Sequence, residues 1–329
     1  MTSFRQALET SVMQEPFKGD LTCQAFYKTG VNKGKPCVKV AYYAQGQGYF
    51  CGTHSKADLR KELKVNPQKA VEKAASIESQ DESIITSFAE NIKHKRAGDV
   101  ICSKMGMRQA VVPVAGYQSV FPNFHHGNHK DGEGCPSLSP MSLGPVVHNI
   151  PNLKPAAHLE GYWQGSKLFG EECREDLISD NEIDWRTATP TEDFHKNRKM
   201  MFFSDPPLRR KPDMTTKTVC FIWVDKQGRE VHLPYVESRQ IYCNLYERLA
   251  EQEDALRQLR DIRKQGMNLN IVGYDGFDFR VKKGETMAEK LMVCYLDPKQ
   301  PFGHELCLVS LLVLKPEEYP WRIHKTLDI

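Results

Sequence analysis

The segment 21–55 most restricts how this chain can fold, because it is too short and too polar to bury a hydrophobic core of its own. Three cysteines at equal intervals and a histidine form its pattern: Cys23, Cys37, Cys51 and His54. Thiolate and imidazole ligands from four such residues satisfy tetrahedral zinc and leave no open position for chemistry. The alternative is that the cysteines are small buried hydrophobic residues. Because something must hold this segment together, we expect a structural zinc site.

The rest of the composition is that of a globular protein. The chain has 329 residues, of which 26% are charged and 40% hydrophobic, and its net charge of +3 is too small to imply a general nucleic-acid coat. No apolar run is long enough to span a membrane, and the first residues lack the pattern of a secretion signal. We expect an intracellular protein, cytoplasmic or nuclear, with no membrane partner. Its ten cysteines then serve as thiols or metal ligands, not disulfides.

The order of predicted elements indicates an α+β fold class. We divide the chain into a zinc-binding module at 1–55, a charged helical linker at 56–97 and an α+β domain at 98–329. Within this domain, residue patterns predict strands at 98–104, 110–120 and 269–275, a hairpin at 218–233, and helices at 238–250 and 254–264. Ser238 is the expected N-cap of the first helix, and Gly266 the expected end of the second. Residues 171–217 are polar and contain prolines, which favours an irregular excursion.

Two segments in the middle of the chain combine polar groups with aromatic ones. Residues 121–135 form a glycine-rich polar loop, and its phenylalanines indicate that the loop packs. Residues 159–169 read as a helix that presents three polar side chains on one face: Glu160, Gln164 and Lys167. A polar stripe beside a packed loop is what a pocket requires. We therefore expect the functional site here.

These two segments resemble the NADAR superfamily. Phe121-Pro-Asn-Phe124 is similar to the family's Ser-Asn-Phe-Tyr type of loop, and the residues from Glu160 to Lys167 match its helix pattern Glu-x-Tyr-x-Gln-x-x-Lys. The resemblance covers about residues 117–314. The family's Asp-x-x-Trp-Gly segment is not present as such, and Asp275 and Asp297 are its two candidate counterparts.

The resemblance implies a NADAR-like α+β domain that hydrolyses an N-glycosidic bond in a ribosyl-base, ADP-ribosyl-base or nucleotide-like substrate, without a redox cofactor. Cleavage of this bond builds oxocarbenium character on the sugar, which a carboxylate stabilises while it activates water. The implied catalytic residues are Glu160, Lys167 and Asn123. The implied substrate-binding residues are Gln164, Tyr162, Trp163, Phe124, Arg239 and Asp275.

The cysteine-rich segment carries a second resemblance. Its Cys51-Gly-Thr-His54 ending, preceded by Lys-Thr and Gly-x-x-Cys elements, is similar to short zinc modules in proteins of large DNA viruses and of some eukaryotes. Such viruses pair these modules with enzymes or with interaction domains. A non-catalytic viral structural or nucleic-acid-associated protein that keeps the fold is therefore the alternative from a different class.

Other interpretations of the same residues stay open. Glu160 and Lys167 could form a solvated helix face above a core of aromatic residues. The loop could hold a second metal ion through His125, His126, His129 and Cys135, with Asp131 or Glu133 as a base, or Cys135 could be a nucleophile. Basic runs at 93–96 and 208–211 leave contact with nucleic acid open.

Overall fold

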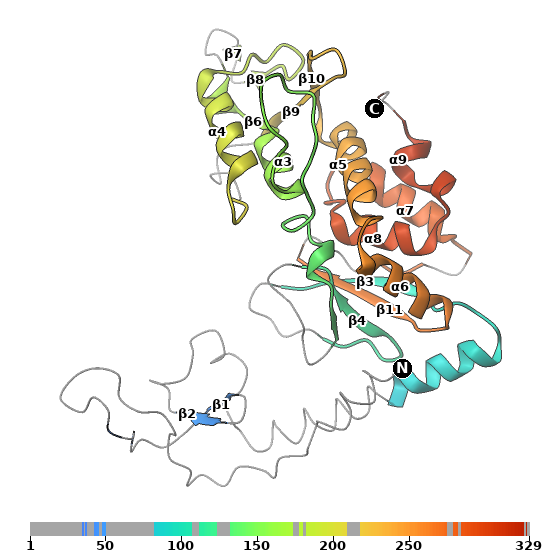
Figure 1. The fold of residues 1–329 in the computed structure, drawn as a ribbon. Helices are drawn as coiled ribbons and strands as arrows, with labels where there is room; N and C mark the ends of the chain where they lie inside the picture. Colours follow the sequence, from blue (N-terminus) through green and yellow to red (C-terminus); the bar gives the residue numbers. More distant parts are fainter. Residues whose placement is uncertain are drawn as a thin grey trace. The chain divides into compact units, whose positions relative to one another are not determined.

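The computed structural model describes residues 35, 37, 43–45, 48–50, 82–106, 112–123, 132–173, 178–179, 182–208, 218–274, 279–281, 284–325 and 327. The chain separates into two compact units, Met1–Asp81 and Glu82–Ile329. In the first unit, β1 (Tyr43–Gln45) and β2 (Gly48–Phe50) form an antiparallel pair. The second unit mixes helices with sheets, as the predicted α+β class requires (Figure 1).

A four-stranded parallel sheet forms one part of the second unit. Its strands, in spatial order, are β3 (Val100–Lys104), β11 (Leu269–Gly273), β4 (Gln118–Phe121) and β5 (Glu133–Gly134). Each neighbouring pair is parallel, and every residue of β11 is buried. The central position of β11 explains its apolar composition, because a strand paired on both edges and covered on both faces has little contact with water.

A group of helices covers this sheet (Figure 1). They are α5 (Tyr235–Ala250), α6 (Asp254–Lys264), α7 (Met287–Leu296), α8 (His304–Val313) and α9 (Pro320–Ile323). The innermost is α8, which contacts β3 and β11 on one side and α5, α6 and α7 on the other. Since α8 meets protein on all sides, it is apolar beyond its first turn except for Ser310, whose hydroxyl donates to Leu306 O at 2.8 Å. Single-turn 3-10 helices occur at Pro136–Leu138, Gly170–Glu172 and Pro316–Glu318.

Asn268 ties the start of β11 to a helix at 82–93. The Asn268 side chain accepts from Asn91 Nδ2 at 2.8 Å and from the main-chain N–H of Asp99 at 2.8 Å, and it donates to Gly116 O at 3.1 Å. The helix at 82–93 thus belongs to the same unit as the sheet. The unit boundary falls at residues 81 and 82, within the stretch that the sequence analysis treats as a linker.

A second sheet is antiparallel, with the order β10 (Glu230–Leu233), β9 (Thr218–Val224) and β6 (Lys167–Phe169). The pairing of β9 with β10 confirms the predicted hairpin. Its turn is closed by Asp225, whose carboxylate accepts from the main-chain N–H groups of Gln227 and Arg229 at 2.9 Å each. Two short antiparallel strands, β7 (Ile178–Ser179) and β8 (Glu182–Ile183), lie in the connection between β6 and α4.

Helices α3 (Leu159–Gly165) and α4 (Glu192–Phe203) pack closely beside this sheet. A Cβ atom at Gly161 would lie 2.5 Å from the main-chain oxygen of Met201, and one at Gly165 would lie 2.8 Å from the Phe202 ring. Only glycine permits this approach. The formation of α4 corrects the expectation of an irregular excursion at 171–217. The sequence pattern does not predict this helix because a charged residue, Arg198, takes one of its buried positions. The other buried positions are Phe194, Met201 and Phe202.

The termini of two predicted helices differ in their agreement with the structure. Helix α6 ends before Gly266, whose φ of +112° suits glycine, and this confirms the predicted stop. Helix α5 instead begins at Tyr235, so the prediction of Ser238 as its N-cap is wrong. The Ser238 hydroxyl lies within the first turn and donates to Tyr235 O at 2.7 Å. A helix can start directly after Pro234 because the proline at this position needs no N–H donor.

Substitution of Gly161 by alanine tests the contact between α3 and α4. Alanine favours a helix over glycine by about 1 kcal/mol, so helix propensity alone predicts stabilisation. We expect the opposite sign, a loss of roughly 1–3 kcal/mol, because the new methyl group meets main-chain atoms that cannot move aside. Urea unfolding of the two proteins measures the difference. A Gly161→Ala protein as stable as the wild type would contradict the close packing.

Candidate functional site

Three of the predicted site residues form one hydrogen-bonded chain. Gln164 Nε2 donates to Glu160 Oε1 at 2.9 Å, and Lys167 Nζ donates to Gln164 Oε1 at 3.0 Å. The predicted helix is too long, because α3 ends at Gly165 and Lys167 opens β6. Lys167 still reaches the polar face of α3 from the first residue of the strand.

The start of α3 fixes the position of Glu160. The Glu160 main-chain N–H donates to Pro140 O at 2.8 Å, and that of Leu159 donates to Leu143 O at 2.8 Å. These bonds satisfy N–H groups that a helix start leaves without a helical partner. Glu160 and Gln164 are 7% and 8% exposed, and Lys167 is half-buried. The three residues therefore do not form a solvated helix face.

Asn123 lies just beyond the carboxyl end of β4 and is 3% exposed. The carboxyl ends of parallel strands commonly border ligand sites in open sheets. A buried polar group that the sequence analysis does not select lies at the end of the neighbouring strand. Glu305, in the first turn of α8, is fully buried, and a Cβ at Gly273 would lie 1.8 Å from its Oε1 atom.

Glu305 also lies 3.2 Å from the imidazole of the preceding residue, measured from its Oε2 atom to His304 Nδ1. A His-Glu pair that opens an otherwise apolar segment is the sequence signal that marks these two residues. The need for glycine at position 273 appears only in the fold, because residues 273 and 305 are far apart in the chain.

The carboxylates of Glu160 and Glu305 act on a common phenol, that of Tyr242 in α5. Burial is the main cause that raises the pKa of Tyr242 well above its ordinary value, followed by the nearby Cys307, Glu160, Tyr246 and Glu305. The pKa of the Tyr246 phenol is also raised well above its ordinary value, and burial is again the main cause. Both tyrosines therefore stay neutral near pH 7. Both belong to the hydrophobic core, and the Tyr246 hydroxyl donates to Leu138 O at 2.9 Å.

The aromatic residues of α3 belong to the core. Tyr162 stacks on His148, with ring centroids 5.9 Å apart, and contacts Phe202 at 5.2 Å. Trp163 is partly buried and lies 4.3 Å from Phe221 and 4.9 Å from Tyr242, centroid to centroid. The Trp163 indole is thus covered by two other rings. Helical geometry places Tyr162 about 200° around α3 from Glu160, so these two side chains leave the helix on opposite sides.

Arg239 serves the structure of the helical layer. Its guanidinium donates to the main-chain oxygens of Cys294 and Asp297 at 3.4 and 2.9 Å, and also to those of Tyr295 and Gln300. These carbonyls lie at the end of α7 and just after it. Arg239 is 1% exposed and therefore links α5 to the C-terminus of α7.

Several predicted residues lie outside the described part of the chain: Cys23, Cys51, His54, Phe124, His125, His126, His129 and Asp275. Cys37 and Cys135 are described, and both are buried. Burial, aided by Glu133, raises the pKa of Cys135 to about 12, so its thiol is poorly suited to act as a nucleophile. Among the described residues, no group of three or more His, Cys, Asp or Glu side chains could hold a metal ion.

The surface features considered from the sequence are described in part. In the basic run at 93–96, Lys93 and His94 each lie beside Glu90, at 3.6 and 3.2 Å. In the run at 208–211, only Leu208 is described. Within the described ranges, no helix has the length and apolar character needed to cross a membrane.

Replacement of Arg239 by methionine tests its structural role. The change leaves several buried carbonyls without donors, so we expect a loss of about 3 kcal/mol or more in the free energy of unfolding. Urea unfolding measures it. Arg257→Met is the control, since exposed Arg257 pairs with Asp254 within its own helix and its replacement should change stability by less than about 0.5 kcal/mol. Unchanged stability in Arg239→Met would leave the guanidinium available for a ligand instead.

Glu160, Gln164 and Lys167 thus form a buried hydrogen-bonded chain. Asn123 lies just beyond the carboxyl end of β4, and Arg239 belongs to the helical layer. The chain matches no known protein family, and comparisons with curated proteins and with solved structures also find no match.

Proposed function

We propose that the protein is an N-glycoside hydrolase that acts on a ribosyl-base or ADP-ribosyl-base substrate, with Glu160 as its catalytic carboxylate. The observation that supports this most is the buried chain from Glu160 through Gln164 to Lys167. A carboxylate on a solvated surface would be screened by water. One that is 7% exposed and held by a fixed donor can stabilise positive charge as it develops on a sugar.

The chemistry of the three side chains fixes their orientation. The Lys167 ammonium can only donate, so it selects the carbonyl oxygen of the Gln164 amide and turns the amide nitrogen toward Glu160. Gln164 therefore holds one oxygen of Glu160. Lys167 supplies positive charge on the far side of the Gln164 amide. The carboxylate would stabilise the oxocarbenium ion and activate the attacking water.

The resemblance to the NADAR superfamily supports the same assignment. Glu160, Gln164 and Lys167 occupy the polar positions of the family's helix pattern, and Asn123 occupies the asparagine of its loop pattern. A NADAR-like fold is part of this proposal. Asn123 would bind a ribose hydroxyl or the edge of the base, because its amide can donate and accept. Glu305 lies in the same polar region around Tyr242 and would be a second acidic group there.

The test measures release of ADP-ribose from ADP-ribosylated guanine by the wild type and by Glu160→Gln. Glutamine keeps the size of the side chain but removes the negative charge, so we expect a loss of about a hundredfold or more in rate. Glu172→Gln is the matched control. Glu172 is also buried, but its carboxylate accepts from Asn197 Nδ2 at 2.7 Å and from the Phe169 N–H at 3.2 Å, outside the proposed site. This variant should keep its activity.

Each outcome of this assay has a definite meaning. Equal turnover by Glu160→Gln and the wild type would exclude Glu160 from the chemistry. Binding of ADP-ribose without turnover in either protein would favour the alternative from a different class, a non-catalytic binding protein that keeps the fold. Neither binding nor turnover would reject the proposed substrate class.

The proposal also includes a structural zinc ion held by Cys23, Cys37, Cys51 and His54. Support comes from Cys37, which is 3% exposed, as expected for a ligand thiolate in a small module. We expect about one zinc ion per purified chain by elemental analysis, and its loss in Cys37→Ser. Cys173→Ser, which changes a buried cysteine of the second unit, should retain the metal. A wild-type protein without zinc would reject the site.

A further inference from the structure

A cavity lies beside α5 and has no part in the proposed hydrolysis. Its volume is about 530 Å³, which is in the range of small-molecule sites. Apolar and aromatic side chains form part of its lining: Tyr162, Trp223, Ile241 and Leu245. Tyr162 leaves α3 on the side opposite to Glu160, so the cavity and the Glu160 chain are separated by this helix.

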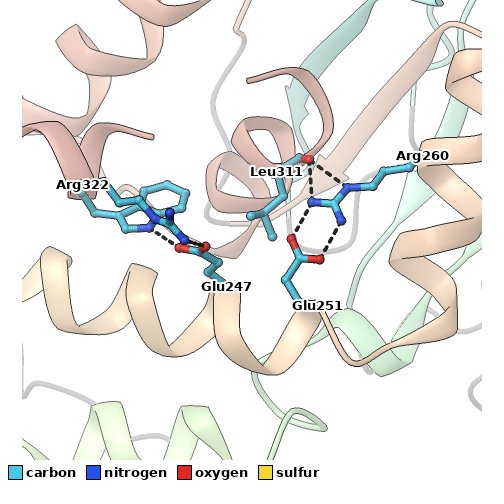
Figure 2. Close-up of polar contacts among 6 residues, drawn as sticks. Glu247, Glu251, Arg260, Leu311 and Arg322 are labelled. Carbon is cyan, nitrogen blue, oxygen red and sulfur yellow. Dashed lines mark hydrogen bonds and ion pairs between the residues drawn. The ribbon is translucent and has the colours of Figure 1, made fainter. Parts of the chain in front are cut away.

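The acidic side chains of the cavity are already paired (Figure 2). Glu247 forms an ion pair with Arg322 and accepts from Trp321 Nε1 at 2.8 Å. Glu251 accepts two hydrogen bonds from Arg260, at 2.6 and 2.7 Å, and Arg260 also donates to Leu311 O. Both carboxylates therefore join α5 to neighbouring helices. Their negative charges are balanced by Arg322 and Arg260.

Two basic side chains of the same lining are not neutralised. Lys226, in the hairpin turn, and Arg248, in the last turn of α5, are exposed. Among the residues that the structure describes, no acidic side chain forms an ion pair with either of them. The lining consequently carries an excess of positive charge at its rim, which favours an anion.

Tyr162 adds a buried polar group to this cavity. The residue is 4% exposed, and no described residue forms a hydrogen bond with its hydroxyl. Burial raises the pKa of Tyr162 to about 12, against the opposing charges of Arg198 and Arg248, so the hydroxyl is a neutral donor near pH 7.

The remaining wall is suited to a flat group. Trp223 is half-buried in β9, and the aliphatic side chains of Ile241 and Leu245 lie on α5. An indole ring can stack on any nucleobase, and each such contact contributes about 1–3 kcal/mol to the free energy of binding. The cavity thus combines a surface for a planar ring with cations at its rim.

We propose that this cavity binds a phosphorylated ligand with a planar apolar part, of the nucleoside monophosphate class. Lys226 and Arg248 would bind the phosphate, Trp223 would stack on the planar part, and the Tyr162 hydroxyl would donate to the ligand. This binding goes beyond the proposed hydrolysis, since none of these interactions involves Glu160 or Lys167.

The experiment uses the full chain and adenosine monophosphate as the probe, with the dissociation constant measured by calorimetry. We expect Lys226→Gln/Arg248→Gln to raise this constant by about tenfold or more, because two charge-assisted contacts are lost. The matched control is Lys199→Gln/Lys299→Gln, which removes the same charge from exposed positions outside the cavity. The control and Glu160→Gln should bind the probe as the wild type does.

Adenosine and inorganic phosphate separate the two halves of the ligand, and each should bind more weakly than the complete probe. Failure of the wild type to bind adenosine monophosphate at millimolar concentration would overturn the proposal. It would also be overturned if the cavity variant bound as the wild type does, or if Glu160→Gln alone abolished binding. Phosphate that binds as tightly as the complete probe would overturn the assignment of the planar part. Thermal unfolding of each variant shows that it is folded.

Discussion

The second unit depends on burial of α8 between the parallel sheet and the other helices. Apart from its last residue, every position of this helix is buried, and its neighbours include β3, β11, α5, α6 and α7. Full burial of a leucine or valine side chain contributes about 1.5–3 kcal/mol, so a helix of this composition is a major source of stability. Each surrounding element is positioned by its contact with α8, including α5, which borders both polar regions of the unit.

The same burial restricts where charge can lie. His304 and Glu305 open α8 and must be accommodated at the edge of the sheet, where Gly273 leaves room for the carboxylate. A buried charge without polar surroundings would be too costly to keep. Burial and the Glu305 carboxylate raise the pKa of both Tyr242 and Tyr246 on α5, and Glu160 of α3 also raises that of Tyr242. Glu160 of α3 and Glu305 of α8 are therefore both close enough to Tyr242 of α5 to influence its phenol within packing that is otherwise apolar.

Local patterns in the sequence predict those elements whose signals are local. The hairpin of β9 and β10 and the stop of α6 at Gly266 follow from turn residues and glycine, and both are confirmed. Helix α4 is missed because Arg198 takes a buried position that periodicity reserves for an apolar residue; there it pairs with Glu230 at 3.1 Å. The candidate site likewise has a part set by local contacts and a part set by contacts that are distant in sequence. Glu160 and Gln164 are separated by one helical turn, but the place of Glu305 depends on Gly273, a contact distant in sequence.

The position of β11 has a consequence for how the chain reaches its fold. This strand lies between β3 and β4, although residues 122–268 separate it from β4 in sequence. Until residues 269–273 emerge from the ribosome, β3 and β4 cannot acquire their common neighbour, and their hydrogen-bonding edges stay open. Sheets built from such distant pairings form slowly. A nascent chain of this protein therefore passes through a long interval in which β3 has no partner strand and β4 is paired only with β5, the interval in which chaperones would protect it from aggregation.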